Sequence, residues 1–422
     1  MAEQTSQLQS YDSAFLCEAL SRVRAAGSGS EICVGLLVGE NTSIAMLDST
    51  GQARAEGTIT DRQPLGCITK VFTGALALSA HVDRCLDFDE GIECIDLHPF
   101  YKEAGGITIR HLLNHTHGLD VTHVHHIEQT PERLIDLNAL GCALQQSRRL
   151  FSPGVLYSYS NAGMWLTAGI LERRYSARFI DLVISKLLRP AEIDVLSDID
   201  ESTWWCPAVG GDFALSIPEF LKFLRWFMSR DRLSSHPELS LPSVPTGRSL
   251  EQGACAGWKY YGAGWYGHQM GTDHASMSFR AHLKKRIAIV AAARAAIATG
   301  VLARIFGEVI PELFSLKLPR PLTTPGPVPD EQLCIGTYLD QGMIVRVIPS
   351  MSMGLEAEIF DRNDALRNKE PAARAVLTPA TGGTYLAASP DRSFFQCMQF
   401  LIRGEQGYEY LWDGRQVMRR AG

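Results

Sequence analysis

A proline-rich stretch near residue 320 divides the chain into two unequal parts. Residues 318–330 read LPRPLTTPGPVPD and contain five prolines within eleven positions. Proline lacks a backbone N–H and has a fixed φ, so such a stretch forms neither a helix nor a central strand and instead makes an extended linker. We therefore predict a large domain over residues 1–317, a linker over 318–330 and a small domain over 331–422.

The region after the linker consists of short β-forming runs separated by turn residues. IVRVIP, TGGTYLAAS and YEYLWDGRQVMRR lie within residues 344–420. The last run contains Asp413 and Gly414, a pair that is typical of tight hairpin turns. Several short strands at this spacing predict a small antiparallel barrel or sandwich of about 90 residues.

The large domain has strand patterns at both ends and helix patterns between them. The apolar runs at 32–39 and 42–47 predict a strand pair joined through Glu40 and Asn41, and residues 285–295 predict a further strand. Helices are expected at 67–81, 107–114, 161–174 and from Pro218 onward. This order predicts an α/β (α+β) domain in which both ends complete one antiparallel sheet, backed by a helical region.

The charge and apolar balance exclude several classes of partner. The net charge is −6 and the pI is about 6.1, so there is no basic surface expected for nucleic acid or for an anionic membrane. Apolar runs such as 279–301 are interrupted by Arg, Lys and His, so no segment is expected to span a bilayer. The N-terminus lacks the pattern of a signal peptide and no Cys-x-x-Cys pair occurs, so we expect a cytoplasmic protein with reduced thiols.

One of the cysteines has chemically suggestive neighbours. Cys67 and Lys70 lie three residues apart in GCITKVFT, so on a helix they project from the same face. A helix N-terminus and a nearby ammonium both favour thiolate over thiol, which would make Cys67 a nucleophile and Lys70 a base. The pair taken alone is also compatible with a buried cysteine and a lysine that reaches the surface.

Five segments resemble, in order, the serine β-lactamase-like superfamily of class C β-lactamases and penicillin-binding proteins. GCITKVFT resembles its Ser-x-x-Lys element, with cysteine in the place of the nucleophilic serine. The other four are ITIRHLLNHTHGLD (107–120), FSPGVLYSYSNAGMWLTAGILE (151–172), VGGDFALSIPEFLKFL (209–224) and YGAGWYGHQMG (261–271). The C-terminal runs are similar to the lipocalin-like β-domain of some members, including penicillin-binding-protein-type thioesterases, which release and cyclise nonribosomal peptides. The resemblance implies a β-lactamase/transpeptidase-like domain followed by a lipocalin-like antiparallel β-domain.

The resemblance also implies five catalytic residues. Cys67 would be the nucleophile and Lys70 the base beside it. Tyr159, in Tyr-Ser-Asn, would carry a proton between the nucleophile and the leaving group, and Asn161 would hydrogen-bond Lys70 or an acyl amide. His268 occupies the third motif, where a cation or donor would hold Tyr159 deprotonated or bind a carboxylate.

Two further residues are expected at the substrate. The backbone N–H groups of Cys67 and of the strand near Gly271 would form the oxyanion hole, worth about 3 kcal/mol per donor in the transition state. Trp265 is assigned beside them as a substrate contact. The sequence departs from the family pattern at Met270, where glycine is usual, and a side chain there is expected to crowd the substrate strand unless the register moves to Gly271.

These residues together predict a covalent acyl-enzyme. A thioester is attacked more readily by amines than an oxoester is, so we favour an acyltransferase or a thioesterase/cyclase of a biosynthetic pathway, transferring the acyl group to an amine or alcohol. A hydrolase (an esterase, amidase or D-peptidase) with the same residues is the first alternative, and a catalytically silent ligand-binding scaffold is the second. The expected ligand is a small-molecule or peptidyl acyl substrate, an acyl or peptidyl carrier protein is a candidate partner, and no cofactor is implied.

Two other clusters are open to a functional interpretation. Five histidines occur in 115–126, which permits a metal site, but a loop that lines the substrate is the preferred interpretation and no metal is assigned. Several aromatic residues are candidates for an acyl pocket, although ordinary core packing explains them equally well. They are Trp204, Trp205, Trp258, Tyr260 and Tyr261.

Overall fold

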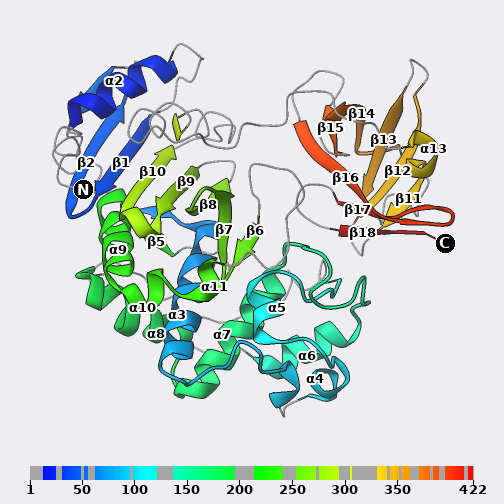
Figure 1. The fold of residues 1–422 in the computed structure, drawn as a ribbon, viewed down its shortest axis with the longest axis horizontal. Helices are drawn as coiled ribbons and strands as arrows, with labels where there is room; N and C mark the ends of the chain where they lie inside the picture. Colours follow the sequence, from blue (N-terminus) through cyan, green and yellow to red (C-terminus); the bar gives the residue numbers. More distant parts are fainter. Residues whose placement is uncertain are drawn as a thin grey trace.

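A computed structural model gives the arrangement of the chain in space (Figure 1). It describes residues 13–24, 31–48, 52–55, 62–95, 98–120, 136–194, 213–240, 253–271, 275–293, 305–306, 330–339, 343–350, 354–361, 370–380, 384–388, 395–412 and 417–421. Most of the proline-rich linker and the Asp413–Gly414 turn lie outside these residues. Among the helices described, none is both long enough and apolar enough to cross a membrane.

Strands from both ends of the large domain meet in one antiparallel sheet, as the sequence predicted. β1 (Ile32–Val38) pairs with β2 (Asn41–Leu47) on one side and with β10 (Ile287–Ala293) on the other. The remaining strands of the sheet are β3 (Ala53–Ala55), β9 (Ser276–His282), β8 (Trp265–Gly271), β7 (Trp258–Gly262) and β6 (Gly253–Cys255). Their order across the sheet is β3-β2-β1-β10-β9-β8-β7-β6, so β8 lies in the interior rather than at an edge.

The sheet is covered on both faces, because neighbouring residues of its strands point to opposite sides. On one face, Leu36 packs in a cluster with Leu16 of α2 (Ser13–Arg24). On the other face, Leu37 joins the main core together with Phe220 of α9 (Ile217–Ser229). Helix α9 begins at a capping box. The side chain of Ser216 accepts a hydrogen bond from the amide of Glu219, and the side chain of Glu219 accepts one from the amide of Ser216.

The helical region follows the predicted pattern with small changes at the ends. The 3-10 turn η2 (Gly66–Thr69) leads into α3 (Lys70–Val82), which is buried along most of its length. The other helices are α4 (Pro99–Glu103), α5 (Ile109–Leu113), α6 (Leu137–Gln145), α7 (Asn161–Tyr175), α8 (Phe179–Val183), α10 (Asp231–Ser234) and α11 (Pro237–Ser240). Short 3-10 turns lie at η3 (Ile92–Cys94) and η6 (Arg189–Ala191), and η5 (Ile184–Leu188) is a short π-helix. A further 3-10 turn, η8 (Leu283–Lys285), joins β9 to β10 in the sheet.

The C-terminal part is a closed antiparallel barrel of eight strands, which confirms a small β-domain. Its interior is filled by apolar side chains, among them Tyr338, Tyr385 and Phe400. The chain enters it through α13 (Glu331–Cys334). The strands are β11 (Gly336–Leu339), β12 (Met343–Pro349), β13 (Leu355–Asp361), β14 (Ala373–Ala380), β15 (Thr384–Ala388), β16 (Phe395–Gly404), β17 (Gly407–Trp412) and β18 (Val417–Arg420).

The barrel contacts the large domain through β17 and β18 (Figure 1). Tyr410, Trp412 and Val417 form an apolar cluster with Leu150 and Phe151, which lie in the loop before α7. The same loop leads to the Tyr-Ser-Asn segment of the second predicted motif, so the barrel touches the large domain close to the predicted site.

Candidate active site

Cys67 lies in the 3-10 turn η2, one residue after Gly66. Gly66 has φ +46°, and a Cβ at this position would lie 3.2 Å from the Cβ of Met270 in β8. A side chain would therefore be strained by the backbone conformation and crowded by β8, which explains the glycine. Met270 is buried against this turn. Cys67 itself is half-buried, and the regular α-helix begins only at Lys70, three residues later than the sequence suggested.

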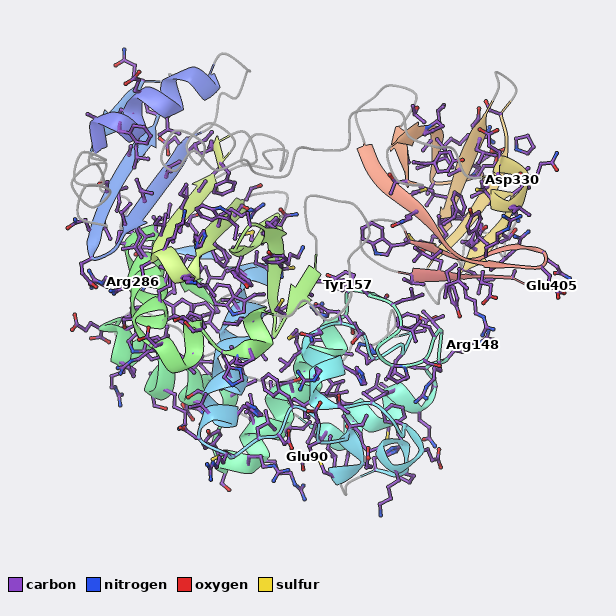
Figure 2. All side chains as sticks on the ribbon, viewed as in Figure 1. Glu90, Arg148, Tyr157, Arg286, Asp330 and Glu405 are labelled. Carbon is purple, nitrogen blue, oxygen red and sulfur yellow. The ribbon has the colours of Figure 1, made fainter. Side chains whose placement is uncertain are left out.

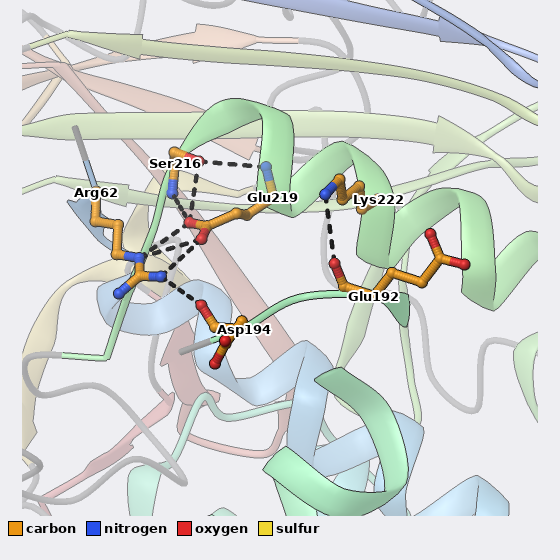
Figure 3. A network of polar contacts seen from close by, with 6 residues as sticks. All are labelled: Arg62, Glu192, Asp194, Ser216, Glu219 and Lys222. Atoms are coloured by element: carbon orange, nitrogen blue, oxygen red, sulfur yellow. Dashed lines mark hydrogen bonds and ion pairs between the residues drawn. The ribbon is translucent and has the colours of Figure 1, made fainter. Parts of the chain in front are cut away.

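The segment before Cys67 is fixed by a polar network at the start of α9 (Figure 3). Arg62 donates hydrogen bonds of 2.8–3.2 Å to the carboxylate of Glu219 and one of 2.7 Å to the carbonyl of Asp194. Glu219 also accepts from the amide and the hydroxyl of Ser216. Burial raises the pKa of Glu219, but the hydrogen bonds from Arg62 and Ser216 outweigh burial and hold that pKa below its ordinary value.

A two-stranded sheet continues this attachment towards Cys67. β4 (Gln63–Pro64) pairs with β5 (Ala214–Leu215), and the amide of Leu65 donates to the carbonyl of Phe213 at 2.8 Å. Backbone bonds therefore hold the chain up to two residues before Cys67. Within the turn, the hydroxyl of Thr69 donates to the carbonyl of Gly66 at 2.7 Å.

Lys70 and Tyr159, two of the residues that the resemblance implies for the site, lie close together. Lys70 is fully buried at the start of α3, and its Nζ lies 4.9 Å from the centroid of the Tyr159 ring. Tyr159 is 5% exposed and precedes α7, whose first residue is Asn161. Cys67 lies one helical turn before Lys70, so two separate segments bring Lys70 and Tyr159 together near the turn that carries the cysteine.

The tyrosine segment is held from behind by His115. The carbonyl of His115 accepts from the amide of Ser158 at 2.8 Å, and its Nδ1 accepts from the amide of Ser160 at 3.1 Å. The imidazole ring also lies 4.7 Å from the ring of Tyr159, centroid to centroid. His115 thus forms hydrogen bonds with the residues on both sides of Tyr159, Ser158 and Ser160.

His115 is a neutral imidazole with a defined tautomer. Its pKa lies well below the ordinary 6.5, because it is buried and because cations, Lys70 foremost, surround it. Since Nδ1 accepts the bond from Ser160, the ring proton resides on Nε2. His115 also has a φ of +57°, and its contacts with the tyrosine segment were missed from the sequence.

His268 reaches the site from β8. Its ring centroid lies 6.2 Å from that of Tyr159, and the residue is 1% exposed. Its Nδ1 is 2.9 Å from the amide nitrogen of Gln269, and its Nε2 is buried with no hydrogen-bond partner among the described residues. Burial, followed by the charges of Lys259 and Lys70, holds its pKa well below 6.5. A cation or a hydrogen-bond donor was expected at this position, and a buried neutral imidazole fits the donor rather than the cation.

Lys259, in β7, was not singled out from the sequence. Its Nζ lies 5.6 Å from the centroid of the Tyr159 ring, so the tyrosine is flanked by two lysines. The adjacent strand β6 contributes Ala254, which packs with Tyr157 and Tyr159. Figure 2 shows Tyr157 beside β6, on the side of the barrel. The sequence feature that could have pointed to Lys259 is its position between two aromatic residues, Trp258 and Tyr260, in an apolar strand.

The two residues assigned to the substrate have different positions. Gly271 ends β8 and is exposed, directly after Met270, which touches the residue before Cys67. Trp265 is fully buried and packs with Tyr261 and α2 on the opposite face of the sheet. Trp265 is therefore not among the groups around Tyr159, and its role is in the core.

The other candidates are core residues or lie outside the description. Trp258 stacks on Phe227 in the main core, and Tyr261 packs against the guanidinium of Arg280. Tyr260 is half-buried and lies 5.2 Å from Tyr266, ring to ring. No group of three or more metal-ligating side chains occurs within the described ranges. Histidines 123, 125 and 126 and tryptophans 204 and 205 fall outside those ranges.

Comparisons with known proteins agree with this architecture. A model of the β-lactamase family matches residues 58–294, which is more than half of the chain. No curated protein sequence matches.

Three solved structures have a similar fold. SurE with D-Leu is 20% identical, covers 100% of both chains and has a TM-score of 0.71. A D-stereospecific amidohydrolase from Streptomyces sp. is 19% identical, with 71% of this chain and 98% of its own covered and a TM-score of 0.53. A D-amino acid amidase from Ochrobactrum anthropi SV3, complexed with L-phenylalanine amide, is 16% identical, with 70% and 98% covered and a TM-score of 0.53. With the match over residues 58–294, the fold establishes that the chain belongs to the β-lactamase family.

Proposed function

We propose that this protein is an acyltransferase or thioesterase/cyclase that works through a covalent acyl-enzyme on Cys67. The observation that carries the proposal is the position of Lys70, one helical turn after Cys67, with its Nζ 4.9 Å from the Tyr159 ring. A nucleophile, a cation and a phenol in this arrangement are the groups that acyl transfer requires.

In the first step the thiol of Cys67 attacks the carbonyl carbon of the acyl donor. The S–H proton passes to the phenolate of Tyr159, and the new S–C bond forms as the carbonyl oxygen takes up negative charge. The backbone amides of Cys67 and Gly271 are suited to bind that oxygen. Cys67 directly follows Gly66, Gly271 directly follows Met270, and Gly66 and Met270 are in contact. When the tetrahedral species collapses, the bond to the leaving group breaks and Tyr159 returns the proton to it.

In the second step an acceptor replaces the departed group. A nucleophilic amine or hydroxyl attacks the thioester carbonyl and gives up its proton to Tyr159. As the S–C bond breaks, Tyr159 passes that proton to the sulfur of Cys67, which leaves as the thiol, and Tyr159 is again a phenolate. Asn161, the first residue of α7, would orient Lys70 or the acyl chain, and neutral His268 would offer a hydrogen-bonding nitrogen instead of a charge.

The cysteine directs the choice of acceptor. A thioester is stabilised less by resonance than an oxoester is, and this increases the rate of attack by amines more than the rate of attack by water. The acyl group would therefore go to an amine or alcohol, with intramolecular attack giving a cyclic product. Such a nucleophile also suits a reducing compartment, which supports the cytoplasm as its location.

The names of the structural neighbours suggest the stereochemistry of the donor. SurE is solved with D-Leu, and the two amide-cleaving neighbours are named for D-amino acids or D-stereospecificity. We extend this to a donor, an activated ester or a carrier-protein thioester, in which a D-residue bears the reacting carbonyl. The amidase neighbours also favour a second candidate, a hydrolase of D-amino acid amides or peptides with the same residues. If neither reaction occurs, the site is a silent ligand-binding scaffold.

The partition of the acyl group decides between these functions. The protein, Cys67→Ser and Cys67→Ala are each given a D-aminoacyl thioester with increasing concentrations of an amine. We expect the native protein to form mostly amide, Cys67→Ser to form more free acid, and Cys67→Ala to form neither above background. Free acid as the main product at high amine would establish the hydrolase, and a native protein that forms neither product above the Cys67→Ala background would leave only the scaffold.

A further inference from the structure

The strand next to the third motif supplies a cation that the motif itself lacks. Lys259 belongs to β7, whereas His268 belongs to the neighbouring β8. The Nζ of Lys259 lies 5.6 Å from the centroid of the Tyr159 ring, nearly as close as the Nζ of Lys70. His268 is a neutral imidazole in these surroundings.

Lys259 is held in place by a rigid hairpin. The β6–β7 turn contains Ala256 and Gly257, both with positive φ. The amide of Ala256 donates to the side chain of Asn114 at 2.7 Å, and that of Gly257 donates to the carbonyl of Leu113 at 3.1 Å. Two bonds thus fix the hairpin to the helical region, two and three residues before Lys259.

The same turn packs against the start of α3. A Cβ at Gly257 would lie only 2.4 Å from the carbonyl oxygen of Lys70, so the two backbones are in close contact. A side chain at Gly74 would likewise meet the carbonyl of Ala256, at 1.7 Å. Backbone packing therefore fixes the position of the β6–β7 turn, and with it the start of β7, relative to the start of α3.

The ionisable groups around Tyr159 come from every element packed against it. They are Lys70 from α3, Lys259 from β7, His268 from β8, His115 from the turn after α5 and Tyr157 from the loop that carries Tyr159. The proposed step adds the Cys67 thiol from η2, which is the proton donor. Both histidines are neutral because of burial and these lysines. The charges that act on Tyr159 from this set are therefore the two ammonium groups.

We infer that Lys259 is a positioning residue that, together with Lys70, keeps Tyr159 ionised to accept the proton of the Cys67 thiol. The inference rests on the proposed acyl transfer and adds to it a second cation, provided by a different strand from the third motif. The proton transfer is the same as in the proposed first step. The S–H bond of Cys67 breaks, the O–H bond of Tyr159 forms, and the proton later goes to the leaving group. Lys259 itself gains and loses no proton.

The size of the expected effect follows from Coulomb's law. A unit charge 5.6 Å from the centroid of the phenolate ring, in a partly buried site, corresponds to a shift of about one to two pH units in the ionisation midpoint. Removing the ammonium should raise the midpoint, because the cation favours the charged form of the phenol. Lys259 is half-buried, so a methionine or glutamine at this position has room.

The test compares Lys259→Met, Lys259→Gln and Lys259→Arg with the native protein. Phenolate absorption is followed by ultraviolet difference titration, each protein being read against the same protein carrying Tyr159→Phe, so that only Tyr159 contributes. The pH profile of single-turnover acylation is measured in parallel. Lys186→Met is the matched control, since Lys186 lies over the ring of Tyr175, 4.4 Å from its centroid, away from this site.

We expect Lys259→Met and Lys259→Gln to raise the Tyr159 midpoint and the acidic limb of the acylation profile by about one to two units. Lys259→Arg should restore both, and Lys186→Met should change neither. An unchanged midpoint in both neutral variants, or an arginine variant that behaves like methionine, would overturn the inference. The titration needs no substrate. An unreactive Cys67 would therefore count against the proposed function, while the titration would still measure the effect of Lys259 on Tyr159.

Discussion

The backbone amide of Val417, in the last strand of the barrel, donates a hydrogen bond of 3.1 Å to the side-chain oxygen of Ser158. Ser158 precedes Tyr159, so the two domains are bonded one residue from the predicted proton carrier. At the other end of the same loop, the hydroxyl of Tyr410 donates to the carbonyl of Leu150 at 3.1 Å. The barrel therefore acts as a brace for the loop that presents Tyr159.

Removal of one bond from this brace should slow acylation. Tyr410→Phe keeps the ring in the apolar contact and loses only the bond to Leu150, which is worth about 1 kcal/mol. If that energy holds the loop in its active position, we expect the single-turnover acylation rate to fall roughly fivefold. Tyr385→Phe, a tyrosine inside the barrel core, is the control and should keep the native rate. Equal rates for Tyr410→Phe and the native protein would show that the brace does not act on catalysis.

His115 should be separable into its two contacts with the tyrosine segment. His115→Phe keeps a ring beside Tyr159 but leaves the amide of Ser160 without its acceptor, at a cost of about 1–3 kcal/mol in unfolding free energy. His115→Asn supplies an acceptor without the ring and should recover part of that loss. The measurement is chemical denaturation of the three proteins. Equal stability of His115→Phe and the native protein would contradict the role of the Nδ1–Ser160 bond.

The network that fixes the approach to Cys67 should be sensitive to pH. The pKa of Glu219 is lowered in the folded protein, so its carboxylate stabilises the fold above the ordinary value of 4.5, and this contribution is lost as the pH falls. Glu219→Gln should reduce the unfolding free energy by about 1–3 kcal/mol at neutral pH. The difference from the native protein should shrink below pH ~4.5. A difference that stayed constant across this range would exclude the charged Arg62–Glu219 interaction as its source.

Buried imidazoles should destabilise the fold in mild acid. Burial lowers the pKa of His117 from 6.5 to about 4, so the unfolded chain takes up a proton at a higher pH than the folded one. Its contribution to stability is complete above pH 6.5 and declines as the pH falls towards 4, by up to about 1.4 kcal/mol per unit. His117→Asn keeps an acceptor for the amide of Leu119 and should flatten the dependence by one proton. An identical pH slope in the two proteins would contradict this assignment.

The sequence was sufficient for the features that depend on local pattern and order. The apolar runs at both ends of the large domain did form neighbouring strands, and the runs after the linker did form a barrel. The proximity of Lys70 and Tyr159 was expected only from the resemblance of their segments to two motifs of the family. Trp265 was wrongly assigned to the substrate, although the alternation of side chains along a strand predicts its true position. It lies three residues before His268 on the same strand and therefore faces the opposite side of the sheet.

The remaining site residues depend on long-range packing. His115 acts through a backbone with positive φ and through a partner 45 residues away, neither of which has a sequence signature. Lys259 reaches Tyr159 from a strand with a register shift between Tyr260 and Gly262, so alternation does not give its direction. The start of β7 is fixed relative to the start of α3 by two glycines, Gly74 and Gly257, that allow the hairpin and the helix to touch.

The most direct test of the account is the intact mass of the protein after brief exposure to a D-aminoacyl thioester, followed by peptide mapping. We predict one acyl adduct, located on Cys67, absent from Cys67→Ala, and discharged faster by an added amine than by water. An adduct on another residue, or none with the native protein across a panel of thioesters and activated esters, would contradict a Cys67 acyl-enzyme.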